Sequence, residues 1–225
     1  MEDVVTQFNK IAKDYDSQRK ELIPVFDDFY GFTIDSIELE DPIPNILEIG
    51  TGTGLLTEMF LEKYPNARMD LVDVSEEMLN IAKERFSGNT NLKFHTKNIM
   101  DFTPEEGKQY DGIISSLAIH HLSLEEKEEL YNKIGEWIKP GGIFVNAEMI
   151  AAETKYLDKI YQKKQIEMAL NAGLDEEGKA KAMERMHLDL KVPVSMQLKW
   201  LENAGFSHVD CVYKAYCFGV LWAKK

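Results

Sequence analysis

The feature that most constrains the fold is the stretch ILEIGTGTGLL, residues 46–56. An apolar run that contains Glu48 is followed by Gly50, Gly52 and Gly54 on alternate positions, and then by a segment with helical spacing. Glycine lets the backbone turn sharply and lets a ligand approach without a Cβ in the way. A strand, a glycine-rich turn and a helix in this order are typical of an open α/β sheet, in which ligands bind beside the carboxyl ends of the strands.

The following sequence repeats this alternation of strand-like and helical runs. The strand-like runs are NILEI, MDLVDV, LKFHTKNI, DGIISSLAI and GGIFVNAEM, and the helical runs between them include LLTEMFLEKY, EEMLNIAKERF and LEEKEELYNKIGEWI. This order predicts βαβ units with right-handed crossovers. Two further strands, HVDCVYKAY and CFGVLWAK, are predicted to form an antiparallel pair at the sheet edge. The expected fold is therefore an α/β, Rossmann-like, doubly wound sheet that is mostly parallel.

We expect one domain, residues 1–225, because this length suits a single α/β core and 44% of the residues are hydrophobic. Residues 1–40 have apolar positions at helical spacing, and the segment DPIPN ends that pattern. Residues 151–192 are charged, Met-rich and helical in pattern, which predicts a cap inserted into the fold. A helix at residues 194–204 should end at Gly205.

Charge and hydropathy exclude some classes of function. The chain has 39 acidic and 26 basic residues, a net charge of -13, which disfavours nucleic acid and anionic membranes as partners. No apolar run approaches the ~20 residues of a membrane span, and the start MEDVVTQ lacks the pattern of a signal peptide. We therefore expect a cytoplasmic protein. Cys211 and Cys217 have no C-x-x-C spacing and are expected to be reduced packing residues.

The glycine spacing and a following carboxylate indicate the kind of ligand. A dinucleotide fingerprint, G-x-G-x-x-G, would need glycine where Leu55 stands, so a nicotinamide-dependent oxidoreductase is the weaker interpretation. The next strand ends at Asp73, twenty-one residues after Gly52. A carboxylate there can accept hydrogen bonds from both ribose hydroxyls of a nucleoside. The alternative is a helix N-cap, since Glu76 and Glu77 follow in the expected first turn.

Five motifs in order resemble the class I S-adenosylmethionine-dependent methyltransferases. They are E-x-G-x-G-x-G, the acidic residue that ends the second strand, NIMDF after the third, DGIISSLAIHHL at the fourth and KPGG before the fifth. The similarity covers residues 8–148. It implies an enzyme that uses S-adenosyl-L-methionine and releases S-adenosyl-L-homocysteine.

The resemblance also implies which residues bind the cofactor. These are Tyr15, Arg19, Glu48, Gly50, Thr51, Gly52, Gly54, Asp73, Val74, Met78, Asn98, Ile99, Ser115 and Leu117. The three glycines would line the methionine end, which Ser115 and Leu117 would border. The FNKIAKDYDSQR stretch is similar to a helix that closes over the cofactor, so residues 1–40 would form a lid. The alternative for Tyr15 and Arg19 is that they are surface residues of a helix.

The remaining cofactor residues would surround the nucleoside. Asp73 would hold the ribose, and Val74 and Met78 would lie near the adenine. Asn98 and Ile99 would meet the adenine amino group and the ring face. Many relatives have aspartate where Asn98 stands, but an amide oxygen can also accept from an amine.

Two histidines follow the fourth strand, where the acceptor is expected to approach. His121 is the candidate general base, because histidine titrates near neutral pH. The alternative is a packing or capping role for at least one of His120 and His121. A metal site is not expected, because His187 and His208 lie far away in sequence and no i, i+4 pair accompanies them.

The C-terminal run LKWLENAGFSHVDCVYKAYCFGVLWAKK is similar to the enzymes that carboxymethylate the tRNA wobble uridine with carboxy-S-adenosylmethionine. Those enzymes grip the extra carboxylate with an arginine, and Ala182 stands at that place here, with Arg185 three residues on. The missing arginine and the acidic charge favour the ordinary cofactor. A basic cluster argues for a polyanion, although interspersed acidic residues also fit a solvated helix face. The cluster is Lys159, Lys163, Lys164, Lys179, Lys181 and Arg185.

We therefore predict a methyltransferase that moves a methyl group to a small-molecule acceptor by in-line displacement. A tRNA wobble-uridine (carboxy)methyltransferase is the alternative within the same class. From other classes, a non-catalytic cofactor-binding module and an oxidoreductase remain as alternatives. We expect a monomer or homodimer with no membrane partner; the acceptor is not predicted, because the fold does not fix function.

Overall fold

The computed structural model describes residues 19, 23, 25–171 and 189–225. The strands are β1 (Asn45–Ile49), β2 (Arg68–Asp73), β3 (Leu92–Thr96), β4 (Tyr110–Ser116), β5 (Ile138–Ala151), β6 (Val192–Pro193), β7 (His208–Ala215) and β8 (Phe218–Lys224). The helices are α3 (Phe26–Asp35), α4 (Leu55–Lys63), α5 (Glu76–Arg85), α6 (Leu124–Trp137), α7 (Lys155–Asn171) and α9 (Val194–Asn203), with short 3-10 turns η2 (Ile99–Asp101) and η3 (Ile119–His121).

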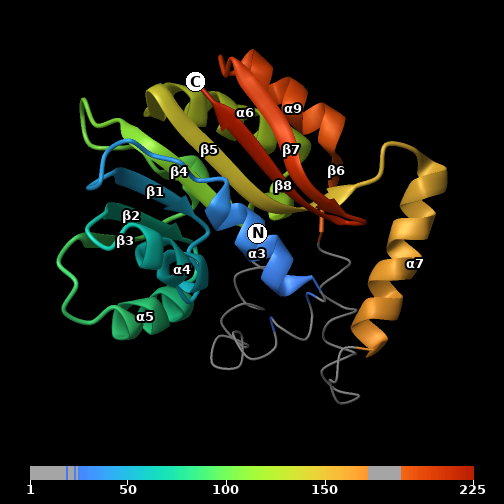
Figure 1. The fold of residues 1–225 in the computed structure, drawn as a ribbon, viewed down its shortest axis with the longest axis horizontal. Helices are drawn as coiled ribbons and strands as arrows, with labels where there is room; N and C mark the ends of the chain where they lie inside the picture. The colour runs from blue at the N-terminus through green and yellow to red at the C-terminus, as the bar shows by residue number, and fades with distance from the viewer. Residues whose placement is uncertain (1–18, 20–22, 24, 172–188) are drawn as a thin grey trace.

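The main sheet has the strand order β3-β2-β1-β4-β5-β8-β7 (Figure 1). Neighbours from β3 to β5 are parallel, whereas β8 is antiparallel to both β5 and β7. This confirms the doubly wound fold with an antiparallel C-terminal end, in which β7 is the edge strand and β8 lies inside the sheet. Strand order reverses between β1 and β4, which is the position where open α/β sheets bind their ligands.

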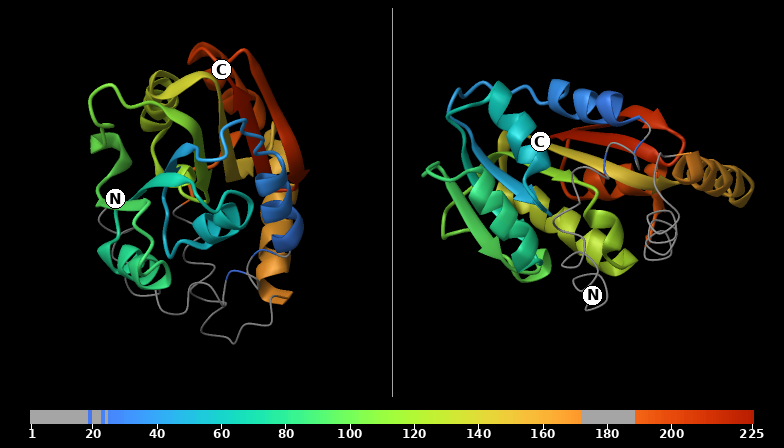
Figure 2. Two further views of the ribbon diagram at one scale, coloured as in Figure 1. Left: turned by 60° about the vertical axis from the view of Figure 1, so that its left-hand side comes forward. Right: turned by 90° about the horizontal axis from the view of Figure 1, so that it is seen from below.

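The sheet is covered on both faces, so its central strands carry apolar side chains on both sides. Along β1, Ile46 packs into one core cluster with residues of α3 and α4. The next residue, Leu47, points to the opposite face and packs in a second cluster with residues of α6 and α9. Figure 2 shows α3 on one side of the sheet and α6 on the other. The two clusters hold the ends of β1 and β4 in fixed positions.

Helix starts near the strand ends follow ordinary capping rules. Ser75 caps α5, and its hydroxyl accepts from the amide of Met78. Ser123 and Glu126 form a reciprocal capping box at the start of α6. These caps define the short connections that leave β2 and β4.

The two segments outside the repeated βα pattern are described only in part. From residues 1–40, α3 packs on the sheet with Phe29 and Tyr30 buried, while Tyr15 lies outside the described residues. From residues 151–192, α7 extends away from the sheet (Figure 1), and β6 pairs with the end of β5. Ala182, Arg185 and other residues of 172–188 also lie outside the described ranges. A lid and a cap remain predictions, as does the single-domain layout.

Within the described ranges, every helix is too short or too polar to cross a membrane.

Gly54 provides a test of the packing around the glycine turn. Its φ is +84°, and an added Cβ would lie 2.6 Å from Cε2 of Phe86. We expect Gly54→Ala to lower the free energy of unfolding by about 2–4 kcal/mol, since backbone strain and overpacking add. The control is Gly107→Ala, whose φ is +76° with nothing within 4 Å of the added atom. Urea denaturation should show the larger loss for Gly54→Ala; equal losses would contradict the packing argument.

Candidate cofactor-binding site

The glycine turn after β1 is pressed against the loop that follows β4. The amide of Gly50 donates to the carbonyl of Val72 over 2.8 Å, and the φ of Gly50 is +71°. A Cβ on Gly50 would lie only 2.1 Å from the Cβ of Ala118. Glycine is therefore required there by both the backbone conformation and the available space.

Asp73 joins the end of β2 to this turn. Its Oδ2 accepts from the amide of Gly52 and its Oδ1 from the amide of Ser75, each over 2.8 Å. Burial raises the pKa of Asp73, and the backbone hydrogen bonds from Ser75, Gly52 and Val74 oppose that rise. Each carboxylate oxygen has a further lone pair, so Asp73 can also accept from hydroxyl groups of a ligand.

A cleft, here called cleft A, opens beside Asp73 with about 790 Å³ of space that includes open solvent. It is lined by Ile49, Gly50, Gly52, Val72, Asp73, Val74, Met78, Lys97, Asn98, Ile99, Ser116, Leu117, Ala118, Ile119, His121 and Leu122. Apolar walls with a few polar groups are the usual lining of a small-molecule site.

A smaller cleft, cleft B, lies on the other side of the glycine turn. It is lined by Arg19, Tyr30, Glu48, Gly50, Thr51, Gly52, Thr53, Leu55, Leu56 and Ser116. Clefts A and B share Gly50, Gly52 and Ser116. An added Cβ on Gly52 would meet nothing within 4 Å, so the turn leaves open space at this junction. An elongated ligand can thus extend from one cleft to the other.

Glu48 is an unusual carboxyl group in the wall of cleft B. It is 1% exposed, and its Oε2 accepts from Oγ1 of Thr57 over 2.5 Å. Burial raises the pKa of Glu48 to about 8, the charge of Asp73 adds to the rise, and the Thr57 hydrogen bond opposes it. A cationic ligand group in cleft B would favour the ionised carboxylate.

Most of the residues predicted from sequence lie around these two clefts. Gly50, Gly52, Asp73, Val74, Met78, Asn98, Ile99, Leu117 and His121 line cleft A, while Arg19, Glu48 and Thr51 line cleft B. Their individual roles remain predictions, and Tyr15 lies outside the described residues.

Two predicted residues do not line either cleft. Gly54, expected at the methionine end of the cofactor, begins α4 and makes room for Phe86 instead. Ser115 is fully buried, and its hydroxyl donates to the carbonyl of Ile49 over 2.9 Å. The adjacent Ser116 lines both clefts, because successive side chains of a strand point to opposite faces.

Sequence reasoning also missed Tyr30, which lines cleft B from α3. Its hydroxyl oxygen accepts from Oγ of Ser116 over 3.1 Å, and the two residues are 86 positions apart. A local motif carries no signal for such a long-range contact.

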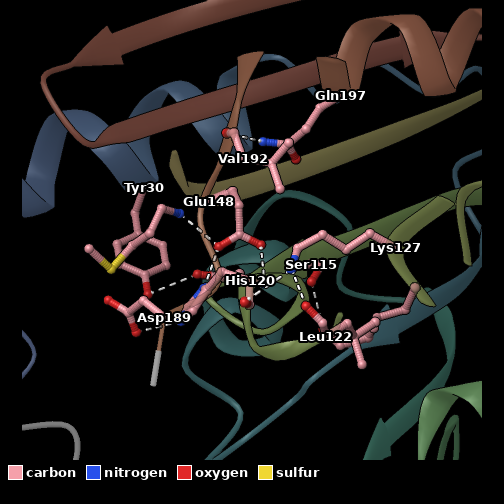
Figure 3. Close-up of polar contacts among 12 residues, drawn as sticks. Tyr30, Ser115, His120, Leu122, Lys127, Glu148, Asp189, Val192 and Gln197 are labelled. Carbon is pink, nitrogen blue, oxygen red and sulfur yellow. Dashed lines mark hydrogen bonds and ion pairs between the residues drawn. The ribbon is translucent and has the colours of Figure 1, made fainter. Parts of the chain in front are cut away.

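The neighbouring histidines have different environments. His121 lines cleft A, whereas His120 is 4% exposed and lies behind it. The Nδ1 of His120 is 2.5 Å from Oε1 of Glu148, a residue of β5. Figure 3 shows His120 between the carboxylates of Glu148 and Asp189. The position of His121 is compatible with the predicted base, while His120 makes buried polar contacts.

The chain is similar in sequence and in structure to known methyltransferases. A family model described as a methyltransferase domain matches residues 46–142. Malonyl-[acyl-carrier protein] O-methyltransferase 2 of Ilyobacter polytropus is 33% identical over 61% of this chain and 50% of its own length. The chain thus spans about half of that relative.

Two further similarities extend over nearly the whole chain. Carboxy-S-adenosyl-L-methionine synthase of Nautilia profundicola is 26% identical over 96% of this chain and 92% of its own length. The solved structure of a DhpI-SAM-HEP complex has a TM-score of 0.68 and 18% identity, and it covers 99% of this chain and 95% of that chain. The latter similarity concerns the fold alone.

The matched residues 46–142 include the glycine turn, Asp73 and all the residues that line cleft A. The fold is similar to that of the DhpI-SAM-HEP complex. Residues 46–142 therefore resemble a methyltransferase domain, and the similarities together support a class I S-adenosylmethionine-dependent methyltransferase whose cofactor is S-adenosyl-L-methionine.

Proposed function

We propose that this chain transfers the methyl group of S-adenosyl-L-methionine to a small-molecule acceptor. The observation that carries the proposal is the hydrogen bond from the Gly52 amide to Asp73, at the junction of the two clefts. It fixes a carboxylate beside a turn in which Gly52 leaves open space at the junction. This arrangement suits a nucleoside joined to an amino acid.

In this proposal the nucleoside lies in cleft A. Asp73 accepts hydrogen bonds from the ribose hydroxyls, and Val74 and Met78 contact the adenine. Ile99 packs on the ring face. Oδ1 of Asn98 accepts from the Met100 amide over 3.0 Å. An amide oxygen can accept two hydrogen bonds, and in this proposal the adenine amino group donates one.

The methionine part of the cofactor occupies cleft B. Arg19 pairs with its carboxylate, and Glu48 faces its positive charges. Thr51 and the glycine amides of the turn provide further polar contacts. The buried position of Glu48 supports this assignment. Away from solvent the dielectric screening is weak, so a carboxylate interacts strongly with a cation that binds next to it.

Methyl transfer requires little acid–base catalysis from the protein, because the sulfonium methyl group is already activated. The acceptor atom attacks the sulfonium methyl, the S–CH₃ bond breaks, and its electron pair stays on sulfur to give S-adenosyl-L-homocysteine. The residues of this chain hold the reactants in line and exclude water. His121, at the edge of cleft A, removes a proton where the acceptor is a hydroxyl or an amine.

The surface charge supports a small acceptor over tRNA. In the described part of the basic cluster, Lys164 lies 2.8 Å from Glu167, and Lys163 lies 3.9 Å from the same carboxylate. These pairs reduce the positive field of α7, and the net charge of the chain is -13.

A second candidate function is formation of the carboxylated cofactor, because the relative that spans 96% of this chain is a carboxy-S-adenosyl-L-methionine synthase.

The purified protein would be incubated with S-adenosyl-L-methionine and a panel of small hydroxyl, carboxyl and amine compounds, and the products identified by mass spectrometry. S-Adenosyl-L-homocysteine with a methylated compound supports the first function. Formation of a carboxylated sulfonium compound would instead support the second function, synthesis of the carboxylated cofactor.

Asp73→Ala tests the nucleoside assignment. We expect affinity for S-adenosyl-L-methionine to fall by about 1–3 kcal/mol, or ~10- to 100-fold, because charge-assisted hydrogen bonds to the ribose are lost. Asp101→Ala removes an exposed carboxylate from η2, outside both clefts, and should bind normally. Both variants would be titrated calorimetrically after their fold is checked by circular dichroism. Unchanged affinity of a folded Asp73→Ala protein would remove the ribose assignment.

Glu48 predicts a pH dependence of cofactor binding. Because its pKa is raised to about 8, the free protein holds Glu48 protonated near neutral pH. The ionised form prefers the cationic ligand, so affinity should rise as the pH increases toward and above 8, with proton release on binding.

The matched variant is Glu48→Gln, which has no titrating group at this position. The ligand's own amino group contributes equally to both proteins, so the difference between their affinity–pH curves isolates Glu48. We expect similar affinities at low pH and a wild-type advantage that appears through pH 8. Parallel curves for the two proteins would show that Glu48 does not face the cofactor.

A further inference from the structure

A group of imidazole and carboxylate side chains lies beside cleft A, which is lined by one of its members, His121. His120, His121 and Asp189 each place one ligand-capable atom so that these atoms all lie within 4.8 Å of one another. The histidines belong to η3, after β4, whereas Asp189 precedes β6 and is 68 or more positions away along the chain. Because of this long separation, no metal-ligand spacing is visible in the sequence.

We propose that His120, His121 and Asp189 form a binding site for a divalent transition-metal ion, of which Zn²⁺ is the best probe. Imidazole nitrogen and carboxylate oxygen are ordinary Zn²⁺ ligands, and three protein ligands with an open fourth position are typical of zinc sites that bind a further molecule. The metal-binding claim does not depend on methyl transfer.

The distance between two of the ligand atoms suits a shared ion. Nε2 of His120 and Oδ1 of Asp189 are 3.5 Å apart, beyond the usual length of a direct hydrogen bond. Two ligands of a tetrahedral ion, each bonded at ~2.0–2.1 Å, are separated by about 3.4 Å. Both side chains are nearly buried, with 5% and 7% of their surface exposed, so solvent does not separate them freely.

Glu148 orients the first ligand. Its Oε1 lies 2.5 Å from Nδ1 of His120, so the ring can donate from Nδ1 and direct Nε2 toward Asp189. A carboxylate behind a ligating histidine is the usual way in which proteins fix the tautomer and the orientation of the ring. Glu148 also accepts from the His120 amide over 3.0 Å, which holds the carboxylate in place.

Backbone contacts hold the two ligand segments together. The Leu190 amide donates to the His120 carbonyl over 3.0 Å, directly beside Asp189. Lys127 donates to the carbonyls of His120 and Leu122 from within the core (Figure 3). Pairing of Ile150 with Val192 then fixes the segment after Asp189 to the end of β5. The ligand atoms are thus positioned by the fold before any ion binds.

Another histidine–aspartate pair in the chain shows how such groups are satisfied without a metal. His95 Nε2 lies 2.9 Å from Asp70, at hydrogen-bond distance, and the same carboxylate accepts from Lys108 and Tyr110. The Lys108 cation neutralises Asp70, and the Tyr110 hydroxyl hydrogen-bonds to it. Asp189 also has polar neighbours, a hydrogen bond from Gln165 and the charge of Lys191, but its contact to His120 is longer and a second imidazole lies nearby.

The competing account is a protonated His120 that bridges the two carboxylates. It does not involve His121, because His120 itself contacts both Glu148 and Asp189. The two accounts therefore differ in the effect of His121 substitution on metal affinity.

One extension rests on the proposed function. Because His121 also lines cleft A, the open coordination position would bind an oxygen or nitrogen donor of the acceptor close to the cofactor. The ion would then act as a Lewis acid that orients the acceptor, and it would replace His121 as the group that activates it.

The test uses full-length protein stripped with a chelator and titrated with Zn²⁺ by calorimetry, and with Co²⁺ by visible absorption. We expect a single tight site with a tetrahedral Co²⁺ spectrum in the wild type. Asp189→Asn and His121→Ala should each weaken Zn²⁺ binding by at least ~10-fold, and Glu148→Gln by about 10- to 100-fold through loss of His120 orientation. His208→Ala removes an exposed histidine of β7 and should leave Zn²⁺ affinity unchanged.

Folding and cofactor binding are measured on the same samples. Absence of a Zn²⁺ site in wild-type protein overturns the inference, as does equal Zn²⁺ affinity of wild type and His121→Ala. If S-adenosyl-L-methionine binds normally in either case, the proposed function stands. Zn²⁺ binding that follows the expected order, in a protein without affinity for S-adenosyl-L-methionine, would support the metal site and reject the proposed function.

Discussion

The arrangement of the site depends on one hydrogen bond, from the amide of Gly52 to the carboxylate of Asp73. It links the turn after β1 to the end of β2, while the contact between Gly50 and Ala118 links the same turn to the loop after β4. Three neighbouring strands thus end at one small region. Because strand order reverses between β1 and β4, their connecting segments diverge and leave clefts A and B beside the turn. A side chain at Gly52 would enter this open space.

Electrostatics divides the region into two parts. On one side, Glu48 is buried in the wall of cleft B and has a raised pKa, which prepares it for a cationic partner. On the other, His120, Glu148 and Asp189 form a polar group next to His121, which lines cleft A. Burial also lowers the pKa of Lys127 to about 8, although nearby Glu148 and Glu126 oppose this effect. The charge of Glu48 in the wall of cleft B is therefore expected to respond to a bound cation.

The sequence predicts the parts of this site that are local. Glycine spacing, apolar strand runs and a strand-terminal carboxylate identify the turn and Asp73, because turn geometry and strand ends depend on neighbouring residues. The motif predicts Ser115 at the cofactor, whereas the neighbouring Ser116 lines both clefts, because the sequence pattern alone does not say which face of β4 points to the opening. Gly54 shares the alternate spacing of its neighbours, yet the closeness of Phe86 gives it a packing role.

Contacts between distant segments could not be predicted in this way. Tyr30 meets Ser116 only because α3 packs across the sheet, and Asp189 approaches His120 only because β6 pairs with the end of β5. The proposed function depends less on those contacts than on the turn and Asp73.

The most direct test of the proposed function is calorimetric titration of the wild-type protein with S-adenosyl-L-methionine and with NAD. Saturable binding of S-adenosyl-L-methionine without binding of NAD is the predicted result; NAD binding, or no affinity for S-adenosyl-L-methionine, would contradict it.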